Sequence, residues 1–406
     1  MRARVPHQAP SLLALLALLT LADPQGAHAQ CLTCIKVATL QGELQDFLCE
    51  GDVIATDPPT SRLVLVNRAC DPSGSKNGET LVLPGGIPRN LTVDSRGFIY
   101  WTDSATQQIL RFDTDAIDFG VVTPDLLAVN PFRRLQELEF TPDGSKLLTT
   151  DPFAIPAGIT WEVDPINGEL ALGVAEEDGV GPFRPRVPYG LAFDPHEPNI
   201  LYFADASVLD GGVYRVDLAD GLRDPVALTD TTLRSLLDAP GGTPVEGLIQ
   251  SPWDVEVYDP TPENNDPPDH VLLVTNSPYP SCCGFDPPSR TKVFVVTNPG
   301  ITRDGNGDII ADEEAYELIL DPVIERPRGL ALADEEGDGD GPDHVYVADE
   351  AQDEFLRFRI SGGGTGVTVE PPIGFDGASQ GGYVGPYGVH VVEQLVLESR
   401  QPFVVV

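Results

Sequence analysis

The chain has 406 residues and a formal net charge of −38, because 63 acidic side chains outnumber 25 lysines and arginines. A surface this acidic argues against nucleic acid and anionic membranes as partners, since both repel a negatively charged protein. Bound cations would instead neutralise part of the charge.

The first residues have the pattern of a secretory signal peptide. Arg2 and Arg4 precede an apolar stretch, 12–22, which is followed by Ala27-His28-Ala29. The stretch is too short to span a bilayer, and no other apolar run approaches that length. We therefore expect cleavage after Ala29 and a secreted or periplasmic protein without a transmembrane segment.

Short β-strand patterns recur along the chain. In the most complete copy, residues 88–113, β-branched and aromatic residues alternate around a tight turn at 94–97. The second strand of each copy ends in Thr or Ala followed by Asp or Asn: Thr56-Asp57, Thr102-Asp103, Thr150-Asp151, Ala204-Asp205, Thr275-Asn276 and Ala348-Asp349. A first-strand motif begins at Pro88, Leu135, Pro188, Pro252, Pro327 and Pro386, and a third strand follows each second one.

Six copies of each strand predict an all-β fold, a six-bladed β-propeller. The repeat begins with a second strand at 53–56, whereas the last first-strand motif lies at 386–391. We therefore expect N-terminal strands to pair with the C-terminal inner strand and close the ring. The predicted organisation is a signal peptide at 1–29, a Cys-containing segment at 30–52 and one propeller domain at 53–406.

The six cysteines are expected to form disulfides, because export places them in an oxidising compartment. Cys49 precedes the second strand of the first copy, and Cys70 follows the third strand of the same copy. We therefore predict a Cys49–Cys70 bond. Cys31 and Cys34 form one close pair, and Cys282 and Cys283 form another. Either each of these pairs closes locally, or the N-terminal pair bonds the second pair.

The first strands are expected to line the channel and to begin at one face, so their motif positions should form rings at the channel mouth. The residues after the motif's first position are Arg89, Gln136, Tyr189, Trp253, Arg328 and Tyr387, and the next are Asn90, Glu137, Gly190, Asp254, Gly329 and Gly388. One interpretation is a plug of mutually paired side chains. The other is a pocket for a small anionic or sugar-like ligand, bound by Arg89, Tyr189, Trp253, Arg328 and Tyr387.

Two segments resemble known propeller repeats. Ile99-Tyr100-Trp101-Thr102-Asp103 is similar to YWTD and NHL-type repeats, and residues 188–193, PYGLAF, resemble a strand of the gluconolactonase and senescence-marker family. The second resemblance implies lactone hydrolysis with a divalent metal held in the channel by Glu, Asn and Asp. The positions with these residue types are Asn90, Glu137 and Asp254, and His390 is the histidine expected nearest the channel.

Two acidic loops carry the spacing of calcium sites. Residues 304–312 place oxygen ligands at positions 1, 3, 5 and 9, which are Asp304, Asn306, Asp308 and Asp312. Their spacing resembles EF-hand-like and integrin-propeller loops. A second loop, 334–343, offers Asp338, Asp340 and Asp343. The alternative for both loops is a solvated acidic turn. We expect Ca²⁺ and no organic cofactor.

These patterns predict an exported propeller that binds a small molecule or protein partner at the channel mouth and is stabilised by calcium. The alternative is a metal-dependent lactonase or related hydrolase that acts in the channel, because propellers serve both kinds of function.

Overall fold

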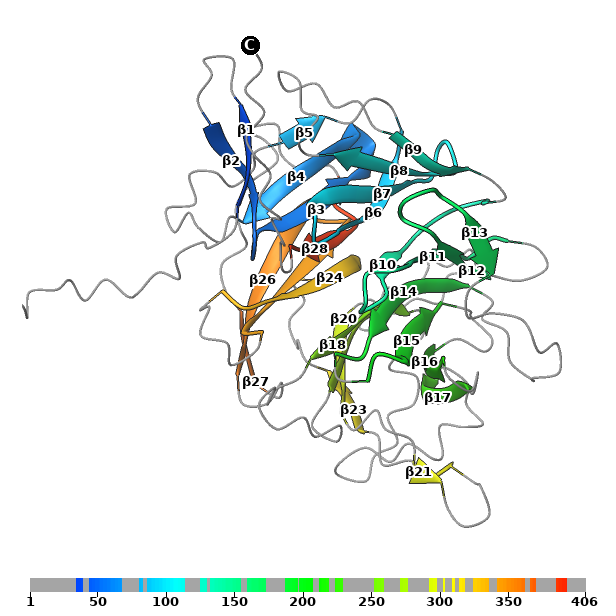
Figure 1. The fold of residues 1–406 in the computed structure, drawn as a ribbon. Coiled ribbons are helices and arrows are strands. Elements are labelled where there is room, and N and C mark those ends of the chain that lie inside the picture. Colours follow the sequence, from blue (N-terminus) through cyan, green and yellow to red (C-terminus); the bar gives the residue numbers. More distant parts are fainter. Residues whose placement is uncertain are drawn as a thin grey trace, which may run out of the picture.

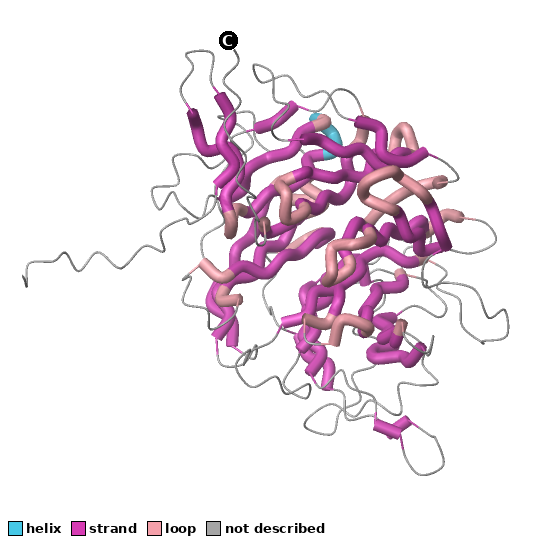
Figure 2. The backbone as a smooth tube through the Cα atoms, viewed as in Figure 1, coloured by secondary structure: helices cyan, strands magenta, loops and turns pink. Residues whose placement is uncertain are grey.

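The structure is a computed structural model of the chain. It describes residues 34–38, 44–67, 80–82, 86–113, 125–129, 132–154, 159–172, 187–195, 197–206, 212–218, 223–228, 252–258, 271–276, 292–297, 302–303, 309–310, 314–317, 324–335, 342–361, 366–369 and 385–392. Strands make up most of this backbone, and the one helix in these ranges is the short η1 (Pro58–Thr60) (Figure 2). No helix among the described residues has the length and apolar character needed to cross a membrane.

Six four-stranded antiparallel sheets form the body of the protein (Figure 1). Their inner strands are β28 (Val389–Val391), β6 (Pro88–Val93), β10 (Leu138–Phe140), β14 (Pro188–Phe193), β18 (Pro252–Tyr258) and β24 (Pro327–Ala333). The second strands are β3 (Val53–Asp57), β7 (Phe98–Asp103), β11 (Leu147–Asp151), β15 (Ile200–Asp205), β19 (Val271–Asn276) and β25 (His344–Asp349). The predicted first and second strands are therefore confirmed.

The outer half of each sheet completes the repeat. The third strands are β4 (Arg62–Asn67), β8 (Gln108–Asp113), β12 (Ile159–Val163), β16 (Gly212–Asp217), β20 (Lys292–Thr297) and β26 (Glu354–Ser361). The fourth are β5 (Thr80–Val82), β9 (Asp125–Val129), β13 (Leu170–Leu172), β17 (Arg223–Leu228), β23 (Glu314–Glu317) and β27 (Gly366–Val369). A separate short hairpin, β21 (Thr302–Arg303) with β22 (Ile309–Ile310), lies in the connection between β20 and β23.

The six sheets form a closed ring. Each inner strand contacts the inner strands of both neighbouring sheets, from β6 through β10, β14, β18 and β24 to β28 and back to β6. The ring closes where β28 pairs with β3, with Val389 opposite Ala55. Two backbone bonds extend this seam, from Gly51 to Val392 at 2.9 Å and from Val392 to Asp52 at 2.8 Å. The predicted closure by both ends of the repeat is confirmed.

The alternation of side chains along each strand builds the core between sheets. On β7, Ile99 and Trp101 pack with Ile54 and Leu65 of the preceding sheet. The side chain between them, Tyr100, instead joins the cluster of the following sheet. A strand of alternating large apolar residues therefore serves two interfaces at once, which explains why its pattern is so distinct in the sequence.

Threonine hydroxyls connect the inner strands of neighbouring sheets. Thr102 Oγ1 accepts from the backbone of Asn90 at 3.1 Å in its own sheet and donates to the carbonyl of Gln136 at 3.1 Å in the next. Equivalent bonds to the next sheet start from the second-strand threonines Thr56, Thr150 and Thr275.

The aspartates that follow these threonines act within one sheet. Asp103 accepts the backbone N–H of Ile87 at 2.9 Å, and Asp151 accepts those of Arg133 and Arg134. They hold the turn that leads into the inner strand of their own sheet. These two aspartates are therefore structural within their own sheets, and the bonds between sheets come from the threonines.

A disulfide-bonded hairpin precedes the ring. β1 (Cys34–Ala38) pairs with β2 (Leu44–Cys49), and Cys34 lies directly opposite Cys49. Their Cα atoms are 4.0 Å apart and the two sulfurs are bonded. The predicted Cys49–Cys70 bond is therefore wrong, because Cys49 ends a strand whose partner lies before it in the chain. Cys31, Cys70, Cys282 and Cys283 lie outside the described residues.

Candidate functional site at the channel mouth

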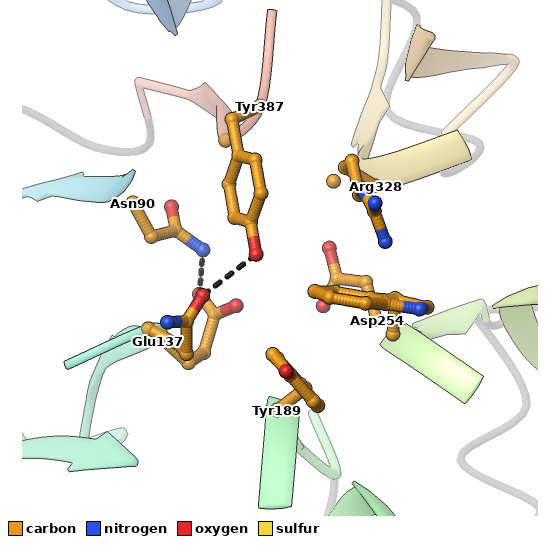
Figure 3. A pocket seen from close by; sticks show the side chains of 10 residues that line it. Asn90, Glu137, Tyr189, Asp254, Arg328 and Tyr387 are labelled. Atoms are coloured by element: carbon orange, nitrogen blue, oxygen red, sulfur yellow. Dashed lines mark hydrogen bonds between the residues drawn. The ribbon is translucent and has the colours of Figure 1, made fainter. Parts of the chain in front are cut away.

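A small cavity lies where the inner strands begin, and a water-sized sphere can occupy about 10 Å³ of it. All six sheets contribute to its lining (Figure 3), which consists of Asn90, Gln136, Glu137, Tyr189, Trp253, Asp254, Arg328, Gly329, Tyr387 and Gly388. These residues come from the two sequence positions that the motif predicted at the channel mouth.

Irregular strand pairing explains why neighbouring residues both reach the cavity. In a regular strand, successive side chains point to opposite faces. The pairing shifts between Pro252 and Asp254, and again between Pro327 and Leu330. Such a bulge changes the direction of the side chains beside it, so Trp253 and Asp254 both line the cavity.

The outer of the two positions forms a layer of aromatic and basic side chains, which we call the mouth layer: Arg89, Gln136, Tyr189, Trp253, Arg328 and Tyr387. The rings of Tyr189 and Trp253 have centroids 3.9 Å apart, and those of Trp253 and Tyr387 are 6.2 Å apart. The guanidinium of Arg328 lies 3.6 Å from the Trp253 centroid, and that of Arg89 lies 4.6 Å from the Tyr387 centroid. Four of the five predicted ligand-binding residues thus line one cavity, and the fifth, Arg89, contacts the ring of Tyr387.

The mouth layer leaves two buried nitrogen atoms without a hydrogen-bond partner. Arg328 is 8% exposed and Gln136 is 2% exposed. Arg328 donates through Nε to Glu350 at 2.6 Å, and Gln136 accepts through Oε1 from the Tyr387 hydroxyl at 2.6 Å. Arg328 Nη1 and Gln136 Nε2 have no partner among the described residues. Both residues line the cavity.

The second position forms the inner lining of the cavity, which we call the floor: Asn90, Glu137 and Asp254. Asn90 donates through Nδ2 to Glu137 Oε1 (Figure 3). Asp254 accepts the backbone N–H of Val255 at 2.9 Å and that of Leu330, in the next sheet, at 2.8 Å. A Cβ atom on Gly190 would lie 2.4 Å from Asp254 Oδ1, so the glycine leaves the room that this carboxylate occupies.

The two floor carboxylates are hard to ionise. Burial raises the pKa of Asp254 to about 7. Burial, then the charges of Asp254 and Glu139, raise the pKa of Glu137 well above its ordinary range. Bonds from Asn90 and from the backbone of Leu138 oppose this shift in Glu137. The floor therefore carries protons more readily than exposed carboxylates do.

The floor does not fit the divalent metal that the lactonase resemblance implies. The Asn90 oxygen accepts the backbone N–H of Leu91 at 2.6 Å, and it is the amide nitrogen that points to Glu137. Each oxygen of Asp254 accepts a backbone N–H. Within the described ranges no three His, Cys, Asp or Glu side chains form a group suited to a metal ion. An oxygen-seeking cation would have to displace these bonds.

His390 lies on β28 opposite Ile54 and is not part of the cavity lining. Burial lowers its pKa to about 4, so the imidazole is neutral at physiological pH. Its Nε2 atom has no partner among the described residues.

Of the predicted calcium ligands, Asp343 is the one that the described residues include. Its Oδ1 accepts the backbone N–H of Glu335 at 2.8 Å and lies 2.9 Å from His344 Nδ1. Asp304, Asn306, Asp308, Asp312, Asp338 and Asp340 fall outside the described residues.

Two contributors to the site were not among the predicted site residues. Gln136 occupies the same motif position as Trp253 and Tyr387, so its place in the channel could be read from the repeat. Glu350 directly follows the aspartate that ends β25, and nothing in the repeat marks it as the partner of Arg328. Its role depends on the three-dimensional approach of two strand ends.

The six sheets around one channel define a β-propeller. No protein-family model and no curated protein matches the chain. A chain in the crystal structure of a nidogen–laminin complex is similar over 85% of this chain and 99% of its own length, with a TM-score of 0.54 and 11% identity. A streptogramin B lyase structure matches over 88% and 86%, with a TM-score of 0.47 and 12% identity. Virginiamycin B lyase from Staphylococcus aureus matches over 87% and 86%, with a TM-score of 0.46 and 13% identity. At these identities the likeness concerns the fold.

Proposed function

We propose that this chain is an exported β-propeller that binds a small ligand in the cavity at its channel mouth. The observation that carries the proposal is that all six sheets contribute side chains to one small cavity, which three aromatic rings line. Small-molecule sites are concave and mostly apolar, with a few well-placed polar groups. Arg328 and Gln136 supply such polar groups, since each has one buried nitrogen without a partner among the described residues.

The burial of the mouth layer favours a small molecule over a protein partner. Tyr189, Trp253 and Tyr387 are 2%, 6% and 7% exposed. A protein surface laid across the mouth would reach little of these rings.

A screen by ligand-observed NMR tests the proposal on the full chain. A fragment library of acids, amides, amines and sugars is expected to give hits whose binding is weakened by Trp253→Phe, which removes part of the aromatic lining. Trp161→Phe serves as the matched control, because Trp161 packs against Phe132 between sheets and does not line the cavity. A library with no hit, or with hits that both variants weaken equally, would contradict the proposal.

Export and calcium binding belong to the same proposal. The signal-peptide pattern that ends at Ala29 supports export, and the bond between Cys34 and Cys49 is of the kind found in oxidising compartments. Calcium would be bound by the two acidic loops. From the strand order we expect both loops at the face opposite the channel mouth, since one lies between β20 and β23 and the other between β24 and β25.

Lactone hydrolysis is the competing function, and the juxtaposition of Glu137 and Asp254 across the floor is the observation in its favour. Under the binding proposal, wild type with added divalent metal should hydrolyse lactones at the buffer background. A wild-type rate above background that Glu137→Gln and Asp254→Asn both abolish would favour the enzyme instead.

A further inference from the structure

Acidic residues are unequally distributed between the two ends of the sheets of β6 and β10. At the mouth face, four segments lead into the motifs of these inner strands or connect the second and third strands of their sheets: 83–87, 130–134, 104–107 and 152–158. None of the four contains Asp, Glu or Lys, although the chain has 63 acidic residues. The turns at the other end of the same two sheets do carry acidic residues: Asp94, Asp143, Asp164 and Glu169.

Basic and apolar side chains occupy this acid-free region, and we call them the arginine patch: Ile87, Arg89, Arg133, Arg134 and Phe153. Asp151 holds one half of the patch, because its carboxylate accepts the backbone N–H groups of Arg133 and Arg134. In the neighbouring sheet, Ser104 accepts from Arg89 Nε at 3.3 Å and donates its backbone N–H to the carbonyl of Ile87 at 3.0 Å.

The two halves of the patch adjoin. Burial raises the pKa of Tyr387 to about 12, and both Arg89 and Arg134 lie near enough to oppose that shift. The guanidinium of Arg89 is 4.6 Å from the centre of the Tyr387 ring. The arginines of two neighbouring sheets therefore form one basic surface beside the channel mouth.

The positive charge of the patch is not neutralised by the described residues. Elsewhere in the described ranges, basic side chains form ion pairs with carboxylates: Arg62, Arg96, Lys146, Arg215 and Arg357. Arg89, Arg133 and Arg134 have no such partner there. In a chain whose acidic side chains far outnumber its basic ones, three neighbouring arginines without a carboxylate indicate that the anion they suit comes from another molecule.

The apolar members of the patch indicate what kind of molecule that is. Ile87 is 39% exposed and Phe153 is 41% exposed. The guanidinium of Arg134 lies 5.0 Å from the centre of the Phe153 ring, an arrangement that orients it without using its in-plane N–H donors. Protein interfaces are enriched in arginine and aromatic residues and depleted in Lys, Glu and Asp, which is the composition of this surface.

We propose that the arginine patch binds an acidic segment of another protein, whose carboxylates accept from the three arginines and whose apolar side chains cover Ile87 and Phe153. A polysaccharide or nucleic acid has no apolar side chains to cover that pair. At physiological ionic strength charges are screened beyond about 8 Å, so a segment on the patch senses the arginines more than the net charge of the chain. The inference goes beyond the proposed function, because no residue of the patch lines the cavity.

Fluorescence anisotropy of the full chain with three labelled peptides tests this assignment. The first is a glutamate-rich peptide with one phenylalanine, the second has glutamine in place of every glutamate, and the third has serine in place of the phenylalanine. We expect the first to bind at least about tenfold more tightly than the second, as expected for the loss of charge-assisted hydrogen bonds, and more tightly than the third. Its affinity should fall as the ionic strength rises.

Variants identify the residues involved. Arg133→Gln combined with Arg134→Gln should weaken binding of the first peptide at least about tenfold. The matched control, Arg96→Gln combined with Lys146→Gln, removes two charges from the other end of the same two sheets, where these side chains are 45% and 41% exposed. Melting temperatures of both double variants are measured. Phe153→Ser gives an independent answer if the first double variant is unfolded, because it should weaken binding of the first peptide and not of the third.

Each outcome supports or overturns the assignment. Loss of binding in the first double variant and not in the control supports it. Equal loss in both, or a first peptide that does not bind, would overturn it, and so would heparin or duplex DNA that binds as tightly as the first peptide. Self-association of wild type that the first double variant abolishes would assign the patch to a second copy of this chain instead. None of these results changes the outcome of the fragment screen, which tests the cavity separately.

Discussion

The guanidinium carbon of Arg328 lies 3.6 Å from the centre of the Trp253 ring. The two residues occupy the same motif position in neighbouring sheets, so the repeat itself brings a cation onto an aromatic face. A desolvated contact of this kind contributes up to about 2 kcal/mol. The mouth layer therefore has a stabilising role that does not depend on a ligand.

Replacing Arg328 with Met is expected to lower the free energy of unfolding by about 1–3 kcal/mol, because the cation–π contact is lost and Glu350 loses its closest partner. Urea denaturation measures the change. Arg326→Met should have a much smaller effect, since its guanidinium is 3.9 Å from Glu350 and its side chain is 41% exposed. Equal losses in the two variants would contradict a specific role for the Trp253 contact.

Replacing Thr102 with Val should lower the unfolding free energy by about 1–3 kcal/mol. The shape is kept, but the buried backbone N–H of Asn90 and the carbonyl of Gln136 lose the hydroxyl that connects them. Thermal denaturation gives the measurement, and Thr106→Val at an exposed position is the control. The chain tolerates alanine at the equivalent positions Ala204 and Ala348, so a neutral result would mean that the seam relaxes around the missing hydroxyl.

The strands could be predicted because each sheet packs between two neighbouring sheets. Ile99, Tyr100 and Trp101 are all large, and alternate members pack against different sheets, so the pattern is imposed from both sides. The positions of the site residues followed from the same repeat, since a motif that starts an inner strand also fixes which residues face the channel.

What the sequence did not reveal depends on contacts outside the repeat. Cys34 and Cys49 meet because of the register of a hairpin that has no equivalent in the other sheets. Whether Arg328 and Gln136 are paired depends on distances between different sheets, and nothing in their local sequence signals it. The pairing of Arg328 with Glu350 is equally a matter of where two strand ends meet.

Peptide mapping under non-reducing conditions should recover a peptide that joins Cys34 to Cys49. The bond closes a loop with a sequence separation of 15, so a Cys34→Ser and Cys49→Ser double variant should lose about 3 kcal/mol on a chain-entropy estimate. The main unfolding transition reports the stability of the ring, so it will show only the part of this loss that destabilises the ring. Recovery of a Cys49–Cys70 peptide would contradict the structure.

Calcium should raise the melting temperature of wild type relative to a chelator. A cation that binds only the native state stabilises it by about 2.7 kcal/mol at a hundredfold excess over its dissociation constant. Asp304→Ala combined with Asp308→Ala should remove most of the gain. Asp143→Ala is the control, because Asp143 is an exposed turn residue whose carboxylate accepts from Ser145 and Thr141. Identical melting temperatures of wild type with calcium and with chelator would contradict calcium binding and mean that the two acidic loops are a solvated surface.

The last prediction concerns Asp254, whose pKa burial raises to about 7 from an ordinary value of 3.8. The folded protein therefore binds this proton more tightly than the unfolded chain does. The associated stability is fully present below about pH 4 and is lost as the pH rises through about 7. Asp254→Asn removes the ionisation, so the stability of wild type relative to this variant should fall steadily between pH 4 and pH 8.

The measurement is the total fall in that difference, which should be about 1.4 kcal/mol for each unit by which the folded and unfolded pKa values differ. Asparagine also weakens one of the two backbone bonds to Val255 and Leu330, but this cost is independent of pH and shifts the whole curve. Loss of the Asp254 charge should also ease the ionisation of Glu137, which acts in the same direction. Asp143→Asn supplies the control, because hydrogen bonds from Ser145 and Thr141 lower the pKa of Asp143 and place its titration below the window. A flat difference between wild type and Asp254→Asn would mean that Asp254 stays ionised, stabilised by a cation or by water in the cavity, and the metal-dependent alternative would regain weight.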